Sequence, residues 1–471
     1  MIQTIAKKEV VEALRDGRFR WSAIVVFVLL LASLFTSWRA VDSEIKEREA
    51  AKAGERKRWV SQDEKNPHSA AHYGNYAFKP KHLLSTLDDG TDPYTGVAVF
   101  LEAHRQNQFE YRKAAEATAV QRFGDVTAAV TMQLLLPLLI VLLAFSTFTR
   151  EREQGNLKLL LSLGVPPNKL MIGKLLGVFG TVLLIVVPAT LIGTFILWQS
   201  SDMKLDGARY GVMVAVYLAF FLMWCALSLT VSAWAKSSRA ALVVLLSLWF
   251  VQSFVVPRVA IEVADERYPL PSLRAYNEEI RKEIRGGIDG HNPADKRRKE
   301  LEVRLLKEYG VDSVHKLPVN FDAIAMQEGE AYASRVFDKH FSDLHQRYEK
   351  QNRLYQIAGF VSPTISIQVL SMASAGTDVW HHRHFAEVAE AYRRVLVREL
   401  NMDMAYHSKT GDSEYKVGKA LWEKIPEFQY TPPEVAWAIA NVSESVVILI
   451  SWLVASLVAL YLAVSKLKGV A

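Results

Sequence analysis

The sequence of 471 residues contains one cysteine, Cys225, and this scarcity excludes two kinds of stabilising centre. A single thiol cannot form an intrachain disulfide, and a zinc cage built from cysteines needs several of them. Cys225 stands in a long apolar stretch, away from the polar segments of the chain. We therefore expect every polar part of the chain to fold by burial of apolar surface alone.

The sequence also lacks the short motifs of common catalytic sites. A phosphate-binding loop of the form Gly-x-x-x-x-Gly-Lys-Ser/Thr is missing, because Gly173-Lys174 is followed by Leu175 and has no upstream glycine at the required spacing. A Gly-x-Ser-x-Gly elbow and a His-Glu-x-x-His helix are absent as well. These absences predict a chain that is not an enzyme, has no catalytic or metal-binding residues and binds no cofactor directly. A membrane enzyme with an external active site is an alternative that no catalytic constellation supports.

Ionisable residues are missing from six long apolar runs, which is the pattern of transmembrane helices. A helix rises about 1.5 Å per residue and needs about 20 apolar residues to cross a bilayer, with every backbone amide paired internally. Carriers driven by protons or ions usually keep ionisable side chains within their spans, so energy coupling through the membrane field is not expected. The six predicted spans are residues 21–38, 126–149, 175–201, 210–235, 240–257 and 445–465.

Lysine and arginine mark one side of the predicted membrane. Basic residues precede the first run, fill the connection 150–174, stand in the short turn after residue 235 and follow the last run. The positive-inside rule places these segments and both termini in the cytoplasm, and predicts a multi-pass protein of a bacterial inner membrane. Topology thus explains the net charge of +6 better than nucleic-acid binding does, and we expect no nucleic-acid partner.

Two long polar insertions, 39–125 and 258–444, fall on the outer side in this arrangement. Their heptad-like mixtures of charged and apolar residues are typical of helices, so we expect one mostly helical extracytoplasmic domain built from both insertions. On the inner side, residues 1–20 form an amphipathic stretch suited to contact with membrane lipids. This stretch does not have the form of a cleaved signal peptide, so we expect the first apolar run to remain as an anchor.

The connection 150–174 carries the most specific pattern of the chain. Its charged head, the central Gly155 and a leucine-rich run suit a short helix that lies along the membrane surface. Gly164, Pro166 and Pro167 then force a turn. A partner protein can push an element of this kind. A basic loop that only satisfies membrane topology is the alternative interpretation.

This connection resembles the coupling segment of ABC-2 exporter permeases, a Glu-rich, Gly-Thr-Leu-containing stretch followed by a Gly-Lys between the second and third spans. Asn156 replaces the usual threonine and Gly164 stands near the usual proline, and both suit the local chemistry of a helix cap and a turn. In that family the segment contacts the ATPase. The resemblance implies ATPase-coupling roles for Glu151, Glu153, Gly155, Asn156, Leu157 and Leu161, and it also includes Ser162, Gly173 and Lys174.

The same resemblance implies a fold, a function and partners. The fold would be an all-α membrane protein with six transmembrane helices, an ABC-2 (type V exporter-like) permease with an elbow helix at residues 1–20. The function would be that of a permease subunit of an ATP-binding cassette exporter. Its partners would be a cytoplasmic ABC ATPase that uses ATP and Mg²⁺, a second permease that is identical or a paralogue, and a periplasmic protein. The alternative is a membrane-anchored scaffold that passes ATPase-driven motion to an external partner without transport.

The insertions resemble those of an ABC-2 subgroup with an enlarged extracytoplasmic part. The residues that carry this resemblance are Ser362-Pro363, Gly376-Thr377-Asp378, His384-Phe385 and Tyr392-Arg393.

The histidines at 381, 382 and 384 stand close enough in sequence to suggest a metal site with Asp378. Arg383 would repel a cation, however, and neighbouring side chains diverge on a helix. We therefore favour the start of a solvated or interfacial helix, capped by Thr377 or Asp378, with Phe385 on its buried face.

Two prolines lie inside predicted spans. Pro137 in the second span and Pro188 in the third would each break a backbone hydrogen bond of the helix. Both are hinge candidates, and a static kink that packing stabilises is the alternative interpretation.

Overall fold

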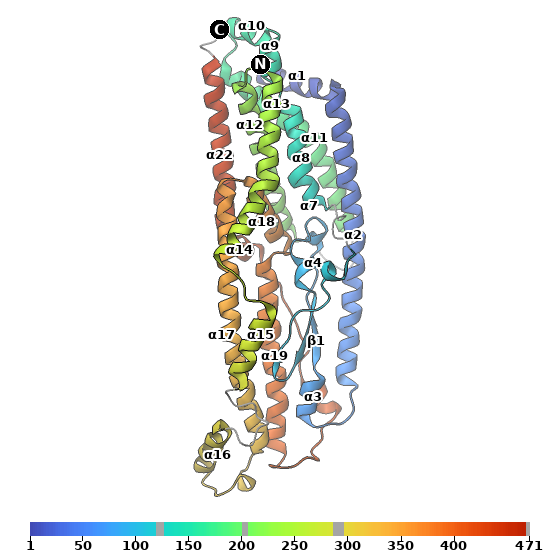
Figure 1. The fold of residues 1–471 in the computed structure, drawn as a ribbon. Coiled ribbons are helices and arrows are strands. Elements are labelled where there is room, and N and C mark those ends of the chain that lie inside the picture. The colour runs from blue at the N-terminus through green and yellow to red at the C-terminus, as the bar shows by residue number, and fades with distance from the viewer. Residues whose placement is uncertain (119–126, 200–205, 286–295, 468–471) are drawn as a thin grey trace.

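Six helices among the described residues are long and apolar enough to cross a membrane, as the sequence predicted. The computed structural model describes residues 1–118, 127–199, 206–285 and 296–467, and it forms a long helical bundle with both termini at one end (Figure 1). The predicted span ends at Val126 and Ser201 lie outside the described residues. The helices that are long and apolar enough to cross a bilayer cover Gly17–Val60, Ala128–Glu153, Pro167–Trp198, Gly207–Trp234, Ser238–Arg267 and Ser443–Ser465.

Three of these crossings are single helices, α11 (Pro167–Trp198), α12 (Gly207–Trp234) and α22 (Ser443–Ser465). The second and fifth contain π-helical turns. The second crossing consists of α7 (Ala128–Val130), η2 (Thr131–Leu135), α8 (Leu136–Ala144) and α9 (Thr149–Glu153). The fifth consists of α13 (Ser238–Phe250), η3 (Val251–Val255) and α14 (Val256–Arg267).

The first crossing belongs to a much longer helix, α2 (Gly17–Val60), which has 44 residues. Its first half is apolar and its second half charged, so one uninterrupted helix leaves the bundle and enters the domain at the far end. The elbow helix α1 is shorter than predicted, because it covers Ile2–Arg15 rather than residues 1–20. Asp16 has an extended backbone and its side chain accepts from the Arg18 amide at 2.8 Å, which starts α2.

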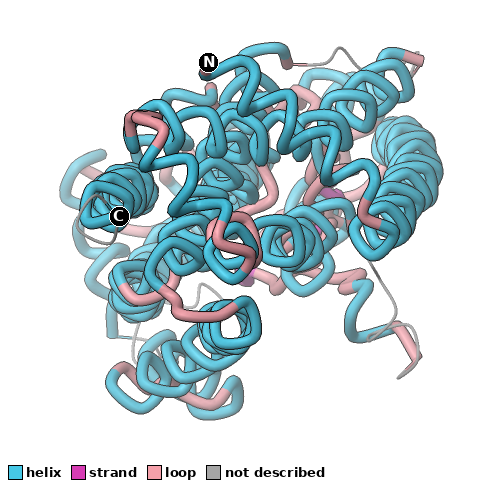
Figure 2. Tube along the Cα trace, turned by 90° about the horizontal axis from the view of Figure 1, so that it is seen from above, coloured by secondary structure: helices cyan, strands magenta, loops and turns pink. Residues whose placement is uncertain are grey.

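The distal domain, at the end away from the termini, is built from residues of both insertions (Figure 1). It is mostly helical, as predicted, and in a view along the molecule the strands show only as short pieces behind the helices (Figure 2). The first insertion contributes α3 (Pro67–Tyr73), β1 (Asn75–Phe78), η1 (Leu83–Thr86), α4 (Asp92–Thr95), β2 (Ala98–Glu102), β3 (Arg105–Gln106) and α5 (Lys113–Glu116). The second insertion contains α15 (Leu273–Arg285), α16 (Lys296–Tyr309), η4 (Val314–Lys316), α17 (Phe321–Ile357), η5 (Ala358–Phe360), α18 (Pro363–Ala375), α19 (Val379–His407), α20 (Lys419–Lys424) and α21 (Val435–Asn441). Of these, η5 and α18 lie outside the distal domain, as described below.

The small sheet is antiparallel in the order β1-β2-β3, and Asn75 pairs with Leu101 in its register. It packs against α19, because Ala77 and Val99 share a buried cluster with Phe385. A second contact joins the end of α2 to α20, where the Trp59 indole donates to the Trp422 carbonyl at 3.0 Å. Apolar burial thus joins the two insertions, without covalent cross-links.

One segment of the second insertion does not lie where its predicted boundary put it. Residues 258–444 were expected to be wholly external, yet η5 and α18 pack among the spans. The Tyr217 hydroxyl in α12 lies 2.9 Å from the Ser371 hydroxyl in α18, and the Trp452 indole in α22 donates to the Gly359 carbonyl at 2.9 Å. The physical reason is length, because an apolar helix of 13 residues is too short to cross a bilayer but long enough to be buried.

Candidate functional site

The predicted coupling segment forms two short helices rather than one. Helix α9 ends at Glu153, and α10 covers Asn156–Ser162. Gly155 separates them with a left-handed φ of 75°, and no atom outside its neighbours lies within 4 Å of an added Cβ. A left-handed residue cannot continue an α-helix, which is why a single helix was the wrong expectation. The predicted turn is confirmed, since Gly164 has a φ of 79° and Pro167 begins α11.

One side of α9 contributes to a buried ionic cluster. Glu151 is 8% exposed, and its Oε1 lies 3.0 Å from the Lys174 ammonium and 2.6 Å from the Lys8 ammonium. Lys174 is fully buried and also lies 2.7 Å from the Glu9 carboxylate of α1. Burial would lower the pKa of Lys8, but the hydrogen bond to Glu151 and the nearby carboxylates outweigh it and raise that pKa. The cluster holds α1, α9 and α11 together.

Two glycines of α11 make room for this arrangement. A Cβ added at Gly173 would lie 2.6 Å from the Ile5 Cβ, and one added at Gly177 would lie 2.6 Å from the Glu9 Cβ. Small residues four positions apart let two helices approach closely, which is a common device in membrane bundles. Gly173 and Lys174, which belong to the family pattern, therefore act together. The glycine admits α1, and the lysine binds the acidic side chain that α1 brings.

The other side of α9 is joined to the turn between α12 and α13. The Glu153 carboxylate accepts from the Ser238 amide at 2.7 Å and from the Ser238 hydroxyl at 2.9 Å, at the first residue of α13. Arg152 donates to the Ala233 carbonyl at 2.6 Å and to the carbonyl of Ala235. Anions at a helix start and cations at a helix end are the favourable pairing with the helix dipole. Glu151 and Glu153 thus connect α9 to neighbouring helices.

Helix α10 is the exposed part of the segment. Leu157 is buried and Leu161 half-buried, whereas Leu159 is 58% and Leu163 72% exposed. The expected capping role of Asn156 is wrong, because Gly155 occupies the cap position and no side chain caps α10. The Asn156 amide instead donates to the Gln154 side chain at 3.3 Å. Next to α10, a cleft of about 330 Å³ opens between α1 and the segment, lined by Lys8, Glu12, Arg150, Gln154, Asn156 and Leu159 among others.

Each of the two π-helical turns is followed closely by a proline, and one of these prolines is a predicted hinge candidate. Pro137 lies two residues after the end of η2, and Pro257 lies two residues after the end of η3. Proline lacks an amide hydrogen, and π-turns often lie at functional sites. Side chains from other elements bind the loosened backbone, since the Trp249 indole donates to the Leu134 carbonyl at 3.1 Å and Ser362 donates to the Gln252 carbonyl at 2.5 Å.

Pro188 differs, because α11 runs through it from Pro167 to Trp198 without a change of helix type. From the sequence, Pro257 was predicted only to be the last residue of the fifth span. Its position two residues after a π-turn matches that of Pro137, and this match makes it the second hinge candidate of the fold.

Two sets of polar contacts connect the membrane-spanning helices with the second insertion. Gln133 of η2 donates to the Tyr217 hydroxyl at 2.9 Å, and Tyr217 in turn meets Ser371 of α18. The buried Arg209, near the start of α12, donates to the Ala373 carbonyl at 3.1 Å and contacts His381 Nε2 at 3.0 Å. The sequence did not indicate the roles of Gln133 and Arg209, because each has a partner more than 80 positions away in the chain.

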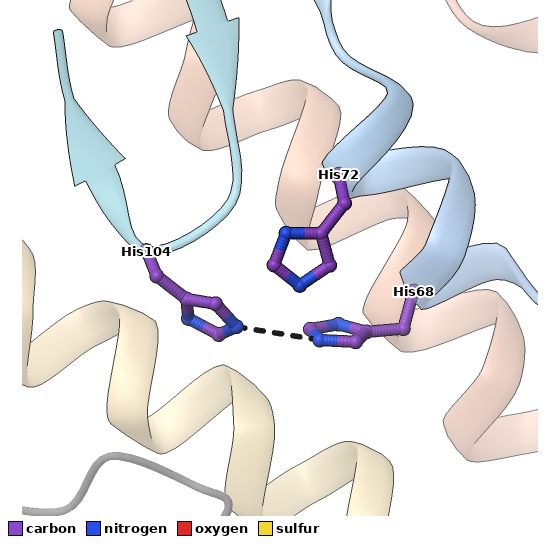
Figure 3. A group of neighbouring side chains, drawn as sticks. All are labelled: His68, His72 and His104. Carbon is purple, nitrogen blue, oxygen red and sulfur yellow. Dashed lines mark hydrogen bonds between the residues drawn. The ribbon is translucent and has the colours of Figure 1, made fainter.

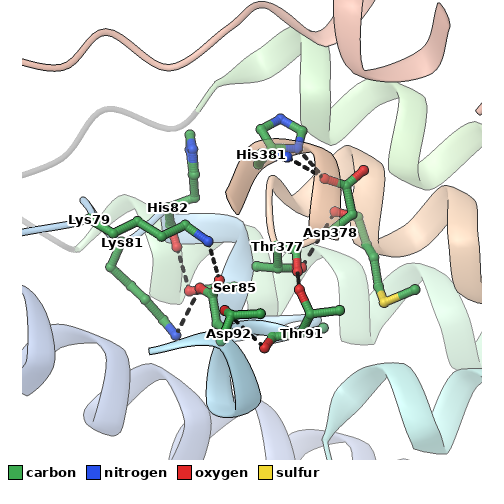
Figure 4. A network of polar contacts seen from close by, with 12 residues as sticks. Lys79, Lys81, His82, Ser85, Thr91, Asp92, Thr377, Asp378 and His381 are labelled. Carbon is green, nitrogen blue, oxygen red and sulfur yellow. Dashed lines mark hydrogen bonds and ion pairs between the residues drawn. The ribbon is translucent and has the colours of Figure 1, made fainter. Parts of the chain in front are cut away.

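The segment around Asp378 ties the two insertions together (Figure 4). Asp378 is the N-cap of α19, as expected, and its carboxylate accepts from the His381 amide at 2.9 Å. The Thr377 carbonyl accepts from the Thr91 amide at 2.8 Å. Close by, Asp92 binds two buried lysines, Lys79 at 2.6 Å and Lys81 at 3.4 Å. The Gly-Thr-Asp motif of the predicted subgroup is therefore a structural junction.

The predicted His cluster is divided among different neighbours. His381 contacts Asp378 and Arg209, His384 lies 3.0 Å from the Tyr430 hydroxyl, and the ring of His382 packs on Phe109. Phe385 is fully buried, as expected for the inner face of the helix. These histidines thus point into separate surroundings, in line with the expectation that they diverge.

In the part of the chain that the structure describes, six helices are long and apolar enough to cross a membrane, which is the architecture of a polytopic membrane protein. Residues 73–266 match the family described as ABC-2 family transporter protein, and residues 275–431 match a domain of unknown function, DUF3526. No curated protein matches the chain. The first match includes the whole connection 150–174, so the resemblance to ABC-2 permeases is confirmed for residues 73–266. This match supports a membrane subunit of an ABC transporter.

Proposed function

We propose that this chain is the permease subunit of an exporter, and that a separate ATPase drives it by docking on α10. The observation that carries the proposal is the contrast between the two short helices. Leu159 on α10 and Leu163 directly after it are exposed, whereas α9 next to them is bound to α1, α11 and the start of α13. An exposed apolar surface beside charged groups is typical of a protein-binding site.

The proposed mechanism starts with a push on α10 from the cytoplasm. The movement passes through Gly155 to α9, which hydrogen bonds and ion pairs join to α1, α11 and α13. Pro137 and Pro257, each behind a π-turn, are the places where the second and fifth crossings can bend. ATP and Mg²⁺ are used by the partner ATPase and not by this non-catalytic chain.

Further partners follow from the exposed surfaces and from the family. Trp21 and Val28 of α2 are 65% and 56% exposed, which suits contact with membrane lipids or with a second permease, identical or related. In the proposed orientation both termini and α10 lie in the cytoplasm of a bacterium. The distal domain then lies outside, where it meets a periplasmic partner or gates the exit.

The test is co-expression with an ATP-binding cassette ATPase from the same genome. The double variant Leu159→Glu/Leu163→Glu should reduce co-purification of the ATPase at least tenfold and remove stimulation of its activity, while membrane insertion stays normal. Leu273→Glu is the matched control, because this leucine is also exposed, at 56%, but lies in the distal domain. Full co-purification with the double variant would refute docking on α10.

The second candidate function is mechanotransmission without transport. The observation that favours it is the continuous polar link from η2 through Tyr217 to α18, together with the Arg209 contacts at the junction. Arg209→Lys separates the two readings, because one ammonium cannot reach all the acceptors of the guanidinium. In reconstituted vesicles, an exporter moves substrate while ATP is hydrolysed. A transmission device hydrolyses ATP without movement of substrate, and Arg209→Lys abolishes the response of its ATPase to the external partner.

A further inference from the structure

Three histidines of the distal domain converge although they come from separate elements. His68 and His72 lie on α3, and His104 lies in the turn between β2 and β3 (Figure 3). One ring nitrogen from each lies within 4.8 Å of the others. The spacing of four residues places His68 and His72 on the same face of their helix, and the hairpin brings His104 opposite to them.

The hydrogen bonds around the rings determine which nitrogens face one another. His68 Nδ1 lies 3.2 Å from the Asn401 side-chain oxygen, which can only accept, so Nδ1 donates. The Asn401 amide nitrogen donates to Gln327 at 3.1 Å, which fixes the orientation of that amide. His104 Nδ1 donates in the same way to the Glu330 carboxylate at 2.7 Å. In a neutral imidazole with a hydrogen on Nδ1, Nε2 carries a lone pair.

The two Nε2 atoms of His68 and His104 lie 3.3 Å apart. The contact is a hydrogen bond when one ring carries the proton between the two nitrogens, and a metal ion can take the place of that proton when both rings are neutral with Nδ1 donating. Tetrahedral zinc binds imidazole nitrogen at about 2.0–2.1 Å, which places two such nitrogens about 3.3 Å from each other. Histidines that bind metals usually donate their other nitrogen to a carboxylate or amide oxygen, as both of these do. The arrangement therefore suits a metal ion.

The surroundings support a built site with one open side. His68 is buried, whereas His72 is exposed and completes the group from the solvent side (Figure 3). His104 has a positive φ of 64°, a conformation that few residues other than glycine adopt. Its backbone amide donates to Glu330 at 2.6 Å, so the same carboxylate holds both the turn and the ring.

The geometry points to a binding site for a divalent transition metal ion of the zinc class, held by His68, His72 and His104. Neutral imidazole suits Zn²⁺, Cu²⁺ and Ni²⁺, and three ligands leave a fourth position for water or a partner. Through Glu330 on α17 and Asn401 on α19, the ion would lock the first insertion onto the second. This site is independent of the proposed ATPase docking, and each can fail without the other.

The test uses the full chain in detergent after removal of metals with a chelator. Titration with Zn²⁺ should give one ion bound per chain and a higher melting temperature, and Co²⁺ should give the visible absorption of a tetrahedral site. His72→Ala and His104→Ala should each weaken Zn²⁺ binding at least tenfold. His407→Ala is the control, because this exposed histidine lies in the same domain on α19 and should not change binding.

Melting temperatures without metal and Zn²⁺ binding together separate the loss of a metal site from a loss of fold. Equal metal-free melting temperatures of wild type and His72→Ala would show that the loss of binding is not a loss of fold. Wild-type protein that binds no Zn²⁺, or a His72→Ala/His104→Ala double variant that binds it as tightly as wild type, would overturn the assignment.

Discussion

The ammonium of Lys174 lies 3.0 Å from the carboxylate of Glu151, and Lys174 has no exposed surface. The pair connects the coupling segment to the helix that follows it. A buried ion pair contributes little net stability compared with apolar side chains, but loss of one partner leaves an uncompensated charge. The pair therefore fixes the position of α9 relative to α11 and to the elbow helix.

Replacement of Lys174 should destabilise the folded protein. Lys174→Met should lower the free energy of unfolding by about 3–5 kcal/mol, because the carboxylates of Glu9 and Glu151 lose the buried cation that they share. Thermal unfolding in detergent measures the effect. Lys158→Met, at an exposed lysine of α10, is the control and should change little. Equal melting temperatures of the two variants would contradict the structural role of the cluster.

The close contact between α1 and α11 gives a second prediction. Gly177→Val should cost about 1–3 kcal/mol, because the new side chain would collide with Glu9 and push α1 away. Gly180→Val lies on the same helix and meets no atom within 4 Å, so it should be neutral. Proteolysis of the elbow helix together with the melting temperature reports the displacement. Equal melting temperatures and equal proteolysis of the two variants would contradict the close contact between α1 and α11.

The break at Gly155 gives a third prediction. Gly155→Pro should reorient α10 and reduce ATPase binding, because proline holds φ near −65° and cannot adopt the observed 75°. The melting temperature should fall modestly, because proline loses the hydrogen bond from the Gly155 amide to the Arg152 carbonyl, although an added Cβ would meet no neighbouring atom. Gly155→Asn should keep near-normal binding, because asparagine tolerates the left-handed conformation. Co-purification of the ATPase with the two variants is the comparison, and equal yields would argue against a role for the turn.

Stability at acid pH should depend on His82. Burial lowers its pKa to about 3, and the charges of Arg209, His381 and Lys79 add to this effect against the opposite influence of Asp92. A histidine with a depressed folded-state pKa gives stability that is complete above about pH 6.5 and is lost as the pH falls toward 3. The loss should reach about 2 kcal/mol at pH 5.

The measurement for His82 is the melting temperature between pH 7 and pH 4.5. His82→Gln should flatten this dependence, while His407→Gln, at an exposed histidine, should leave it unchanged. An identical slope for wild type and His82→Gln would show that another group titrates.

The six crossings were predictable because long apolar runs without charge have few other solutions in water or lipid. Helix α18 was missed as a buried element, since its 13 residues fall below the length of a span. The small sheet was missed as well, because strands of four and five residues such as β1 and β2 give too little alternation to stand out.

The position of the candidate site in the sequence was predictable, but the contacts that shape it were not. The Glu-rich head and the Gly-Lys identified the segment, yet its geometry depends on Glu9, Gly177 and Ser238, which are distant in sequence. The same holds for the three histidines of the distal domain. The spacing of His68 and His72 is visible in the sequence, but His104 joins them only through a hairpin and a carboxylate from another helix.

The unbroken course of α2 has a geometric consequence. At about 1.5 Å per residue its 44 residues form a rod of about 66 Å. A pivot of about 5° at its base, where Asp16 joins it to the elbow helix, would carry Trp59 at the opposite tip through about 6 Å. Such a lever would amplify a displacement of ångström scale near α1 into one large enough to break and remake contacts around Trp422.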